Sequence, residues 1–564
     1  MAADYRTQAL QDPTTVLQEL YRAHGNAENF PRFVAEHFSQ LFETPGSYKR
    51  IPTLNVSSPP QSHQDRSLVR FRAMVQDTSL STEMYLSKHN DGSCGGWGIY
   101  EAEAESSSSA REVDYTHLQE CSVLWATSVP AESEWCAHEL DQLEGGQESA
   151  VDATASTPPV LQLSHKFPHS DRGHIGLQVK VYDRNEVETF KSTDIVTFIG
   201  IISTEACVLD RTQEIAIEVP TLHVLFTKSH GPGLVPRVFP RLVRRTEENH
   251  QGVSIGESAK PIAQDNADTR RELIRWMAEE ALGGDLRAAE WVLFSCIARV
   301  QSRHPPLLPP SLVVSRFPAP PPVPSTVGPS ATPVPTLSAV LAALLPLTYP
   351  LNLSLESLNK TRYTPESKDE DLHAGVLQLP QGTVMLVSEG GVREGQLLEQ
   401  GIMNVRALQE VMDAQTLAYV FPFSQFSFPT DISCIIVTEG RKSAFFRTDF
   451  NIPLCAPNDS AAVAALYKPA DQIKMPSPEK LATFRDLVVG ARCGKVQVPE
   501  ATSEHIQAQF VLERQRDRNV TADDLIRWMT VSKLHALSLH EPTLSVETWQ
   551  HAKALDDQRR ALLS

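Results

Sequence analysis

A short apolar run inside residues 377–397 constrains this 564-residue chain more than any other stretch. The stretch reads LQLPQGTVMLVSEGGVREGQL, in which a turn signal precedes the apolar residues Val384–Val387 and the polar pair Ser388 and Glu389 follows them. A short apolar run bounded by turn residues is typical of a buried strand, and α/β proteins bind ligands just beyond the carboxyl ends of such strands. The stretch therefore predicts an α/β domain with a polar site at one strand tip.

The segment before this strand lacks the residues that hold a nucleotide. A short strand is predicted at Ser311–Val314, followed by a proline-rich loop and a helix that begins near Thr336. A phosphate-binding loop in this arrangement needs glycine N–H groups that face phosphate and a lysine that reaches the terminal phosphates. This loop offers proline, which has no N–H, and the next lysine is Lys360. The sequence therefore predicts no nucleotide cofactor.

The polar pair at the strand tip is also incomplete as a metal site. On the plan of AAA+ ATPases the strand ends in two acids that hold magnesium and activate water, whereas this chain has Ser388 and Glu389. A hydroxyl without charge is a poor magnesium ligand compared with a carboxylate. We therefore predict a degenerate AAA+-like α/β domain that has no catalytic residues and no bound metal.

Patterns along the chain predict several domains, as its length also requires. Helical stripes occupy the N-terminus, a period of two begins at Ser67, and capped helices such as the one at Thr521 and Asp524 occupy the C-terminus. The predicted regions are an N-terminal helical segment, 1–60; an OB-like β domain with polar insertions, 61–235; a linker, 236–266; the degenerate AAA+-like domain without a P-loop, 267–475; and a helical, lid-like region, 476–564.

The predicted β domain begins with the alternating strand LVRFRAMVQD, which reads as half-buried. Its polar face carries Arg70 and Arg72, which we expect to be solvated because no stacking aromatic of an OB-type nucleic-acid reader is evident beside them. Further strands are predicted at Trp97–Tyr100, Cys121–Val129, Gly176–Tyr182, Ile195–Ser203 and Thr221–Thr227.

Two helices are predicted between the linker and the α/β strands. Thr269 and Glu272 form a capping box that predicts the start of the first helix, and Asp285 is expected to cap the second. The second helix is apolar around most of its circumference, which predicts a place in the core.

Charge and cysteine content exclude several classes of function. The chain carries 51 Lys+Arg against 69 Asp+Glu, a formal net charge of -18, which opposes broad binding to phosphate backbones. The best basic run, Pro240–Arg245, is more typical of a solvated linker edge than of a nuclear-import signal. The eight cysteines form no CxxC pair, and no apolar run is long enough to span a bilayer. A cytosolic or nuclear protein without membrane association is expected.

Motifs in one order along most of the chain resemble the mini-chromosome maintenance (MCM) complex-binding protein family. The matching segments are IPTLN from Ile51, LVRFRAMVQD from Leu68, VKVYD from Val179, FKSTDIVTFIGIIS from Phe190, VPTLHVLF from Val219, GGDLRAAEWVLFSCIARV from Gly283, LQLPQGT from Leu377, EGQL from Glu394, VTEGRKS from Val437 and TADDLIRW from Thr521. Relatives in that family can carry an acidic pair where this chain has Ser388 and Glu389.

The resemblance implies a nuclear, non-enzymatic partner of the hexameric replicative helicase. Members associate with MCM subunits in place of one usual subunit and act in DNA replication, helicase unloading or assembly, and sister-chromatid cohesion, so chromatin is reached indirectly. No small-molecule substrate is implied. Arg441 and Lys442 follow a buried strand predicted at Ile432–Val437 and are our candidates for partner contact, with a solvated turn as the alternative. An NTPase based on Glu389 and Arg441, or an OB-type binder of single-stranded nucleic acid, are the alternative functions.

Overall fold

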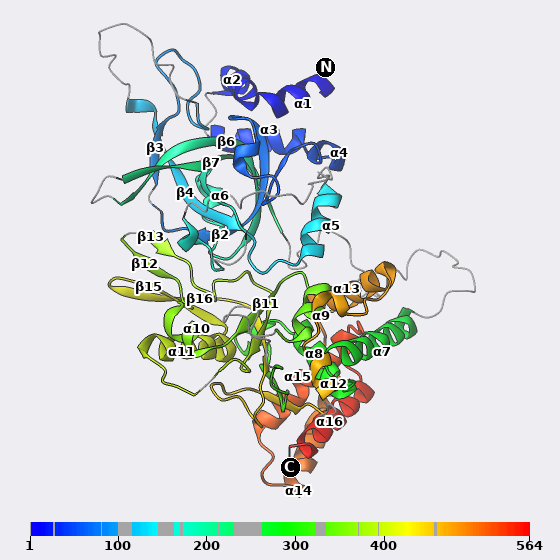
Figure 1. Cartoon of the computed structure of the whole chain (residues 1–564). Coiled ribbons are helices and arrows are strands. Elements are labelled where there is room, and N and C mark those ends of the chain that lie inside the picture. Colours follow the sequence, from blue (N-terminus) through cyan, green and yellow to red (C-terminus); the bar gives the residue numbers. More distant parts are fainter. Residues whose placement is uncertain are drawn as a thin grey trace, which may run out of the picture.

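The computed structural model describes most of the chain and arranges it as an N-terminal part, residues 2–230, above a C-terminal part, residues 262–563 (Figure 1). The described residues are 2–25, 29–80, 82–99, 115–144, 163–169, 173–210, 215–230, 262–321, 334–369, 371–392, 394–455 and 460–563. The predicted mixed α/β architecture with helices at both ends is confirmed. Positions 236–261 of the predicted linker lie outside the described residues, as does the basic run Pro240–Arg245.

Helices cover one side of the N-terminal β sheet. They are α1 (Ala2–Gln11), α2 (Pro13–His24), α3 (Phe30–Leu41) and α4 (Pro45–Tyr48). The side chain of Asp12 accepts a hydrogen bond from the N–H of Thr15 at 3.0 Å, which caps the start of α2. The apolar face of α2 and α3 packs against Leu68 and Ile199 of the sheet, which explains why these helices form.

The N-terminal sheet has seven strands in the order β1-β2-β6-β7-β5-β4-β3. Its elements are β1 (Thr53–Leu54), β2 (Leu68–Asp77), β3 (Glu83–Leu86), β4 (Leu118–Ser128), β5 (Gly176–Val181), β6 (Ile195–Asp210) and β7 (Ile215–Ser229), with the short helices α5 (Glu134–Glu144) and α6 (Arg184–Val187). Strand β2 also pairs with β4, so the hydrogen-bonded circuit β2-β6-β7-β5-β4 returns to its start. The segment predicted as a strand at Trp97 instead forms turns and isolated bridges, including Gly96 to Ile99.

Both faces of β2 are buried, so the prediction of a half-buried strand with a solvated arginine face is wrong. The Arg70 side chain is fully buried, and its guanidinium lies 4.9 Å from the ring centre of Tyr48 in α4. Arg72 forms an ion pair with Glu132. Different segments cover the face that local alternation presented as polar: Tyr48 of α4 lies beside Arg70, Glu132 pairs with Arg72, and Gln378 of the C-terminal part meets Gln76. Cation–π and ion-pair contacts make the arginines compatible with packing.

The C-terminal part contains a five-stranded parallel sheet between two layers, in the order β11-β14-β17-β10-β18. Its strands are β10 (Leu312–Ser315), β11 (Thr348–Asn352), β14 (Thr383–Ser388), β17 (Ile432–Val437) and β18 (Phe450–Pro453). The apolar run of β14 alternates between the layers: Val384 and Leu386 face a core with the helices near α8, and Met385 and Val387 face a second core. Burial on both faces accounts for the uninterrupted apolar run.

Helices and a second sheet cover the two faces of the parallel sheet. The helices are α7 (Ile262–Ala281), α8 (Leu286–Ile297), α9 (Thr336–Leu344), α10 (Leu355–Lys360), α11 (Glu399–Ala414), α12 (Ser460–Ala465), α13 (Pro478–Cys493), α14 (Glu500–Arg516), α15 (Ala522–Ser538) and α16 (Val546–Ala561). The second sheet contains β12 (Glu366–Lys368), β13 (Asp371–His373), β15 (Thr416–Phe421) and β16 (Ser424–Pro429) in the order β13-β12-β15-β16, and β8 (Ser302–Arg303) pairs with β9 (Pro306–Leu307).

The helix caps are largely those that the sequence predicts. Asp285 caps α8 by accepting from the N–H groups of Arg287 and Ala288, and Thr521 with Asp524 forms the capping box of α15. The predicted start at Thr269 is wrong, because α7 already begins at Ile262. Among the described residues, no helix combines the length and the apolarity needed to cross a membrane.

Buried polar side chains join the two parts of the chain. The side-chain amide of Gln378 donates to the carbonyl oxygen of Gln76 at 2.8 Å, and both residues are fully buried. The ammonium of Lys166 lies 2.9 Å from Asp77 Oδ2 and also pairs with Asp371 of β13. The interface therefore has a fixed set of donors and acceptors in place of a purely apolar contact.

Candidate functional site

The carboxyl edge of the parallel sheet is the position at which α/β proteins of this kind bind ligands. Strand β10 lies between β17 and β18, so the loops after β10, β14 and β17 meet there. They carry Ser315, the pair Ser388 and Glu389, and Thr438, all of which are buried. The structure thus brings together the strand tips that the sequence singles out.

Glu389 is committed to the protein's own loop. Its carboxylate accepts a hydrogen bond from the Ser443 hydroxyl at 2.5 Å and another from the N–H of Ala444 at 3.1 Å. Its own N–H donates to the carbonyl oxygen of Val437 at 3.0 Å. Because each carboxylate oxygen accepts a hydrogen bond from the segment after β17, Glu389 fixes this loop.

The loop after β10 covers the same edge. Arg316 adopts a left-handed φ of 56°, and its N–H donates to the carbonyl oxygen of Gly440 at 2.9 Å. The Phe317 side chain is 2% exposed and meets the Tyr467 ring edge to face, and the Tyr467 hydroxyl donates to the carbonyl oxygen of Pro318 at 2.7 Å. The chain's own aromatic and proline residues therefore pack where a phosphate-binding loop would leave open N–H groups.

A proline closes the approach to the strand tip from the same loop. An added Cβ at Gly390 would lie 3.1 Å from Cδ of Pro320, which places the proline ring directly against the backbone after Glu389. The described start of the loop after β10 therefore packs against the backbone just beyond β14. The edge is therefore a packed surface among the described residues.

Arg441 and Lys442 lie in the turn after β17 and are exposed. The Arg441 carbonyl oxygen accepts a hydrogen bond from the side-chain amide of Asn451 at 2.8 Å, which anchors the turn by its backbone. Neither side chain forms an ion pair with a described residue. Their exposure agrees with the sequence-based expectation, and contact with a partner remains a prediction.

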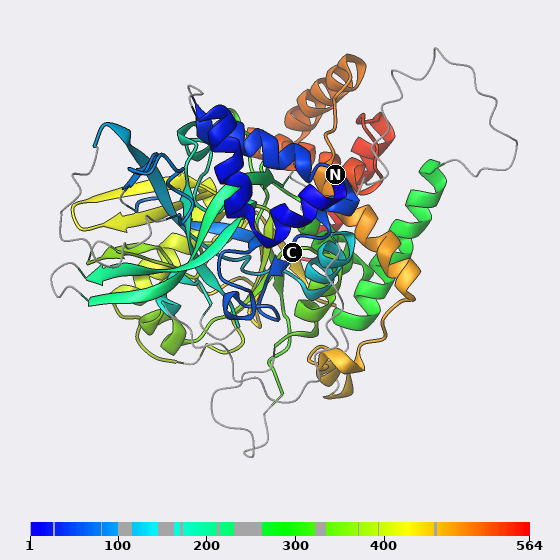
Figure 2. The same cartoon turned by 90° about the horizontal axis from the view of Figure 1, so that it is seen from above.

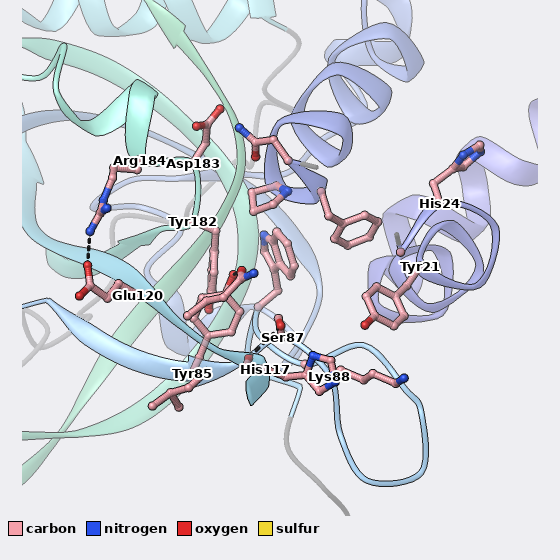
Figure 3. Close-up of a pocket in the computed structure, with 18 of the residues that line it drawn as sticks. Tyr21, His24, Tyr85, Ser87, Lys88, His117, Glu120, Tyr182, Asp183 and Arg184 are labelled. Atoms are coloured by element: carbon pink, nitrogen blue, oxygen red, sulfur yellow. Dashed lines mark hydrogen bonds and ion pairs between the residues drawn. The ribbon is translucent and has the colours of Figure 1, made fainter. Parts of the chain in front are cut away.

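A cavity of about 1150 Å³ lies between the N-terminal helices and the β domain, and the sequence did not predict it (Figure 3). Figure 3 shows Tyr21 and His24 on the helical side and Tyr85 and Tyr182 on the strand side. Tyr182 stacks on Trp97 with ring centres 4.5 Å apart, and Tyr85 meets Tyr182 edge to face at 4.9 Å. These aromatics come from segments far apart in the chain, so no local pattern could have grouped them.

Among the described residues, two clusters bring three possible metal ligands within 4.8 Å of one another, and in each the carboxylate also pairs with a cationic side chain. In the first cluster, His165, Asp371 and His373, the Asp371 carboxylate is already paired with the ammonium of Lys166. Burial raises the pKa of Asp371, but the hydrogen bond from His165 and the charge of Lys166 outweigh burial and hold it at about 2. In the second, which contains Glu290, the carboxylate is paired with Arg270 at 2.5 Å.

Together, these observations define a multidomain α/β protein in which the described residues of the loop after β10 pack against the carboxyl edge of the parallel sheet. The sequence matches the family described as mini-chromosome maintenance replisome factor over residues 38–159 and 142–563. The chain belongs to this family, which confirms the resemblance inferred from its motifs.

Relatives across plants, insects and vertebrates match almost the whole chain. Proteins named mini-chromosome maintenance complex-binding protein are 24% identical in Arabidopsis thaliana (94% of this chain, 93% of the relative), 26% in Drosophila melanogaster (92% and 93%) and 24% in Homo sapiens (98% and 97%). The similarity is therefore to whole proteins and not to one shared domain.

Proposed function

We propose that this chain is a non-enzymatic binding protein of the MCM replicative helicase, with an OB-like domain followed by a degenerate AAA+-like domain and a helical lid. It associates with MCM subunits in place of one usual subunit and acts in the nucleus in DNA replication, helicase unloading or assembly, and sister-chromatid cohesion. Chromatin is contacted through the helicase. The observation that carries the proposal is the packed carboxyl edge, where Glu389 holds the loop after β17, Phe317 is buried and Pro320 lies against Gly390.

Strand arrangement supports a helicase-like shape. The closed circuit β2-β6-β7-β5-β4 has five strands, and one of its pairings, β5 with β7, is parallel. A parallel pair of this kind is compatible with the crossover connection of a Greek-key OB barrel. In the parallel sheet, β10 lies between β17 and β18, which come last in the chain. The strand order therefore reverses beside β10, and nucleotides bind at such a reversal in α/β proteins. The names of the relatives, which describe binding to the MCM complex, give the partner.

The first prediction concerns helicase binding. We expect the purified chain to recover recombinant MCM subunits in a stoichiometric complex, and we expect R441E with K442E to weaken that complex because both side chains are exposed and free of ion pairs with described residues. The matched control reverses Arg514 and Arg516, which are also exposed, on α14. Mass photometry of mixed proteins measures the complex. Recovery of no subunit contradicts the proposal, and equal effects of the two double variants remove Arg441 and Lys442 from the interface.

The second prediction concerns nucleotide binding. Ligand at about 100 times its dissociation constant adds about 2.7 kcal/mol of stability, so we expect millimolar Mg-ATP to leave the thermal unfolding curve unchanged. S388D is expected to hydrolyse no ATP, because Glu389 remains bonded to Ser443 and the loop after β10 offers no lysine. A rise in melting temperature with Mg-ATP, or hydrolysis by S388D above the wild-type level, indicates the alternative NTPase function.

Arg70 and Arg72 give no support to the alternative of single-strand binding. Both guanidiniums are engaged inside the N-terminal part, Arg70 with Tyr48 and Thr53 and Arg72 with Glu132. They are therefore not placed to neutralise a phosphate backbone.

A further inference from the structure

The hairpin of β15 and β16 leaves a sheet edge open (Figure 2, yellow). Strand β16 pairs only with β15 among the described strands, and all six of its residues are exposed. The other end of this sheet is covered, since the N–H of Ala374 beside β13 donates to the carbonyl oxygen of His165 at 2.8 Å. The N-terminal part likewise covers β11 through a bridge between Glu132 and Leu347. The chain thus protects these two edges and leaves β16 uncovered.

The pairing register shows which backbone groups of β16 point outward. The N–H of Thr430 donates to the carbonyl oxygen of Gln415, and the register then makes Phe428 and Phe426 hydrogen-bonded partners of β15. Alternate residues of an antiparallel strand direct their N–H and C=O groups the other way. Gln425 and Ser427 therefore direct their N–H and C=O groups to the open edge. They are two residues apart, so these groups lie on the same side of the extended strand.

Apolar side chains line this edge. Phe426 is 55% exposed and Phe428 is 44% exposed, and they lie on one face, where they meet Phe421 and Tyr419 of β15 edge to face. Phe423 at the turn is fully exposed. The apolar surface around buried Tyr419 therefore extends onto Phe426 and Phe428, which are exposed at the edge of the sheet. A strand added at this edge would bury these two side chains.

The charge pattern is unusual for an exposed edge. Residues 416–430, TLAYVFPFSQFSFPT, contain no charged side chain, whereas natural proteins protect open edges with lysine or other charges. An uncharged edge is compatible with burial, because a partner strand meets no ion that must lose its water. A second copy of this chain is a poor occupant, because two molecules that each carry a formal charge of -18 repel.

We propose that β16 is a docking edge to which an MCM subunit adds an extended, uncharged segment as a fifth strand, with apolar side chains over Phe426 and Phe428. This inference rests on the proposed function, which names the partner. Main-chain hydrogen bonds at Gln425 and Ser427 give affinity, and the two phenylalanines select alternate apolar side chains of the added strand.

The test removes one outward N–H and leaves the backbone pairing of β15 with β16 in place. It also removes the Ser427 hydroxyl, which donates to Glu410 Oε1 at 3.5 Å. S427P deletes the Ser427 donor and places its ring at the open edge, where proline is tolerated in edge strands. The control S427T keeps the N–H and the strand preference. With full-length protein and recombinant MCM subunits, we expect S427P to weaken binding at least about tenfold and S427T to bind like the wild type, with unchanged thermal unfolding for both.

Hydrogen–deuterium exchange separates the possible outcomes. In the wild-type complex, we expect the peptide that contains Gln425 and Ser427 to exchange more slowly than in the free chain. Equal binding by S427P, or unchanged exchange in the complex, overturns the docking edge while leaving MCM binding intact. Loss of a self-association by S427P in the absence of MCM subunits assigns the edge to a second copy and also overturns the proposal. Failure of the wild type to bind any MCM subunit overturns the proposed function as well.

Discussion

The variant K166M is expected to lower the free energy of unfolding by about 3–5 kcal/mol. The ammonium of Lys166 is 3% exposed and pairs with the fully buried carboxylate of Asp77 and with Asp371, so its removal leaves a buried charge without its cation. The hydrogen bonds from the N–H and hydroxyl of Ser79 to Asp77, at 2.8 and 2.6 Å, compensate only part of that loss. Urea unfolding measures the change, and Trp125, whose ring centre lies 5.9 Å from the Lys166 ammonium, is a local fluorescence reporter.

The double variant K166M with D77N is the control for this interface. Asparagine keeps the shape of Asp77 and can still accept from Ser79, but it carries no charge that needs a cation. We therefore expect the double variant to be more stable than K166M alone. A loss below about 1 kcal/mol in K166M, or a double variant that is less stable than the single one, contradicts the view that charge pairing holds the two parts together.

Acid is expected to destabilise the chain through His535. Burial lowers the pKa of His535 to about 3, and the nearby charges of Arg270 and His551 act in the same direction. Below its ordinary value near 6.5 the unfolded imidazole binds a proton that the folded one does not, so stability falls as the pH falls from 6.5 towards 3. The expected slope from this group is about 1.4 kcal/mol per pH unit.

Two variants isolate this effect from other titrating groups. His230, whose pKa burial also lowers to about 3, steepens the slope of the whole chain equally in wild type and variants. H535Q is expected to flatten the dependence of urea unfolding on pH, because glutamine does not titrate. H551Q changes an exposed histidine on α16 and is expected to leave most of the slope in place. Equal slopes for the wild type and H535Q contradict this assignment.

Local sequence patterns predicted individual strands and helix caps. Which of their side chains are buried became clear only from the three-dimensional structure. The strand at Ile432–Val437 and the cap at Asp285 follow from patterns within a few residues, and both are confirmed. The solvated face expected for Arg70 is wrong because Tyr48, 22 positions earlier, covers it. Alternation records which side chains are charged, but a neighbouring helix decides which of them meet water.

At the carboxyl edge of the parallel sheet, too, the sequence predicted some features and missed others. The sequence identified Glu389 at a strand tip and the absence of lysine in the loop after β10, but its hydrogen-bond partner Ser443 lies 54 residues away. The role of the carboxylate therefore could not be predicted from its own neighbourhood. In contrast, the sequence of β16 contains no charged residue, but its open edge follows only from the strand order of the structure.

The polar interface between the two parts affects how the protein is made. Synthesis proceeds from the N-terminus, so Gln76 and Asp77 leave the ribosome long before Gln378. Before the C-terminal part is made, Gln76 and Asp77 are hydrated. The surface that will later meet the C-terminal part therefore carries polar side chains here in place of an exposed apolar patch that could aggregate. The N-terminal part is therefore suited to fold early and to wait without aggregating. When the C-terminal part docks, its donors and acceptors replace that water. Docking in a wrong orientation would leave buried polar groups of the interface without hydrogen-bond partners, which costs free energy.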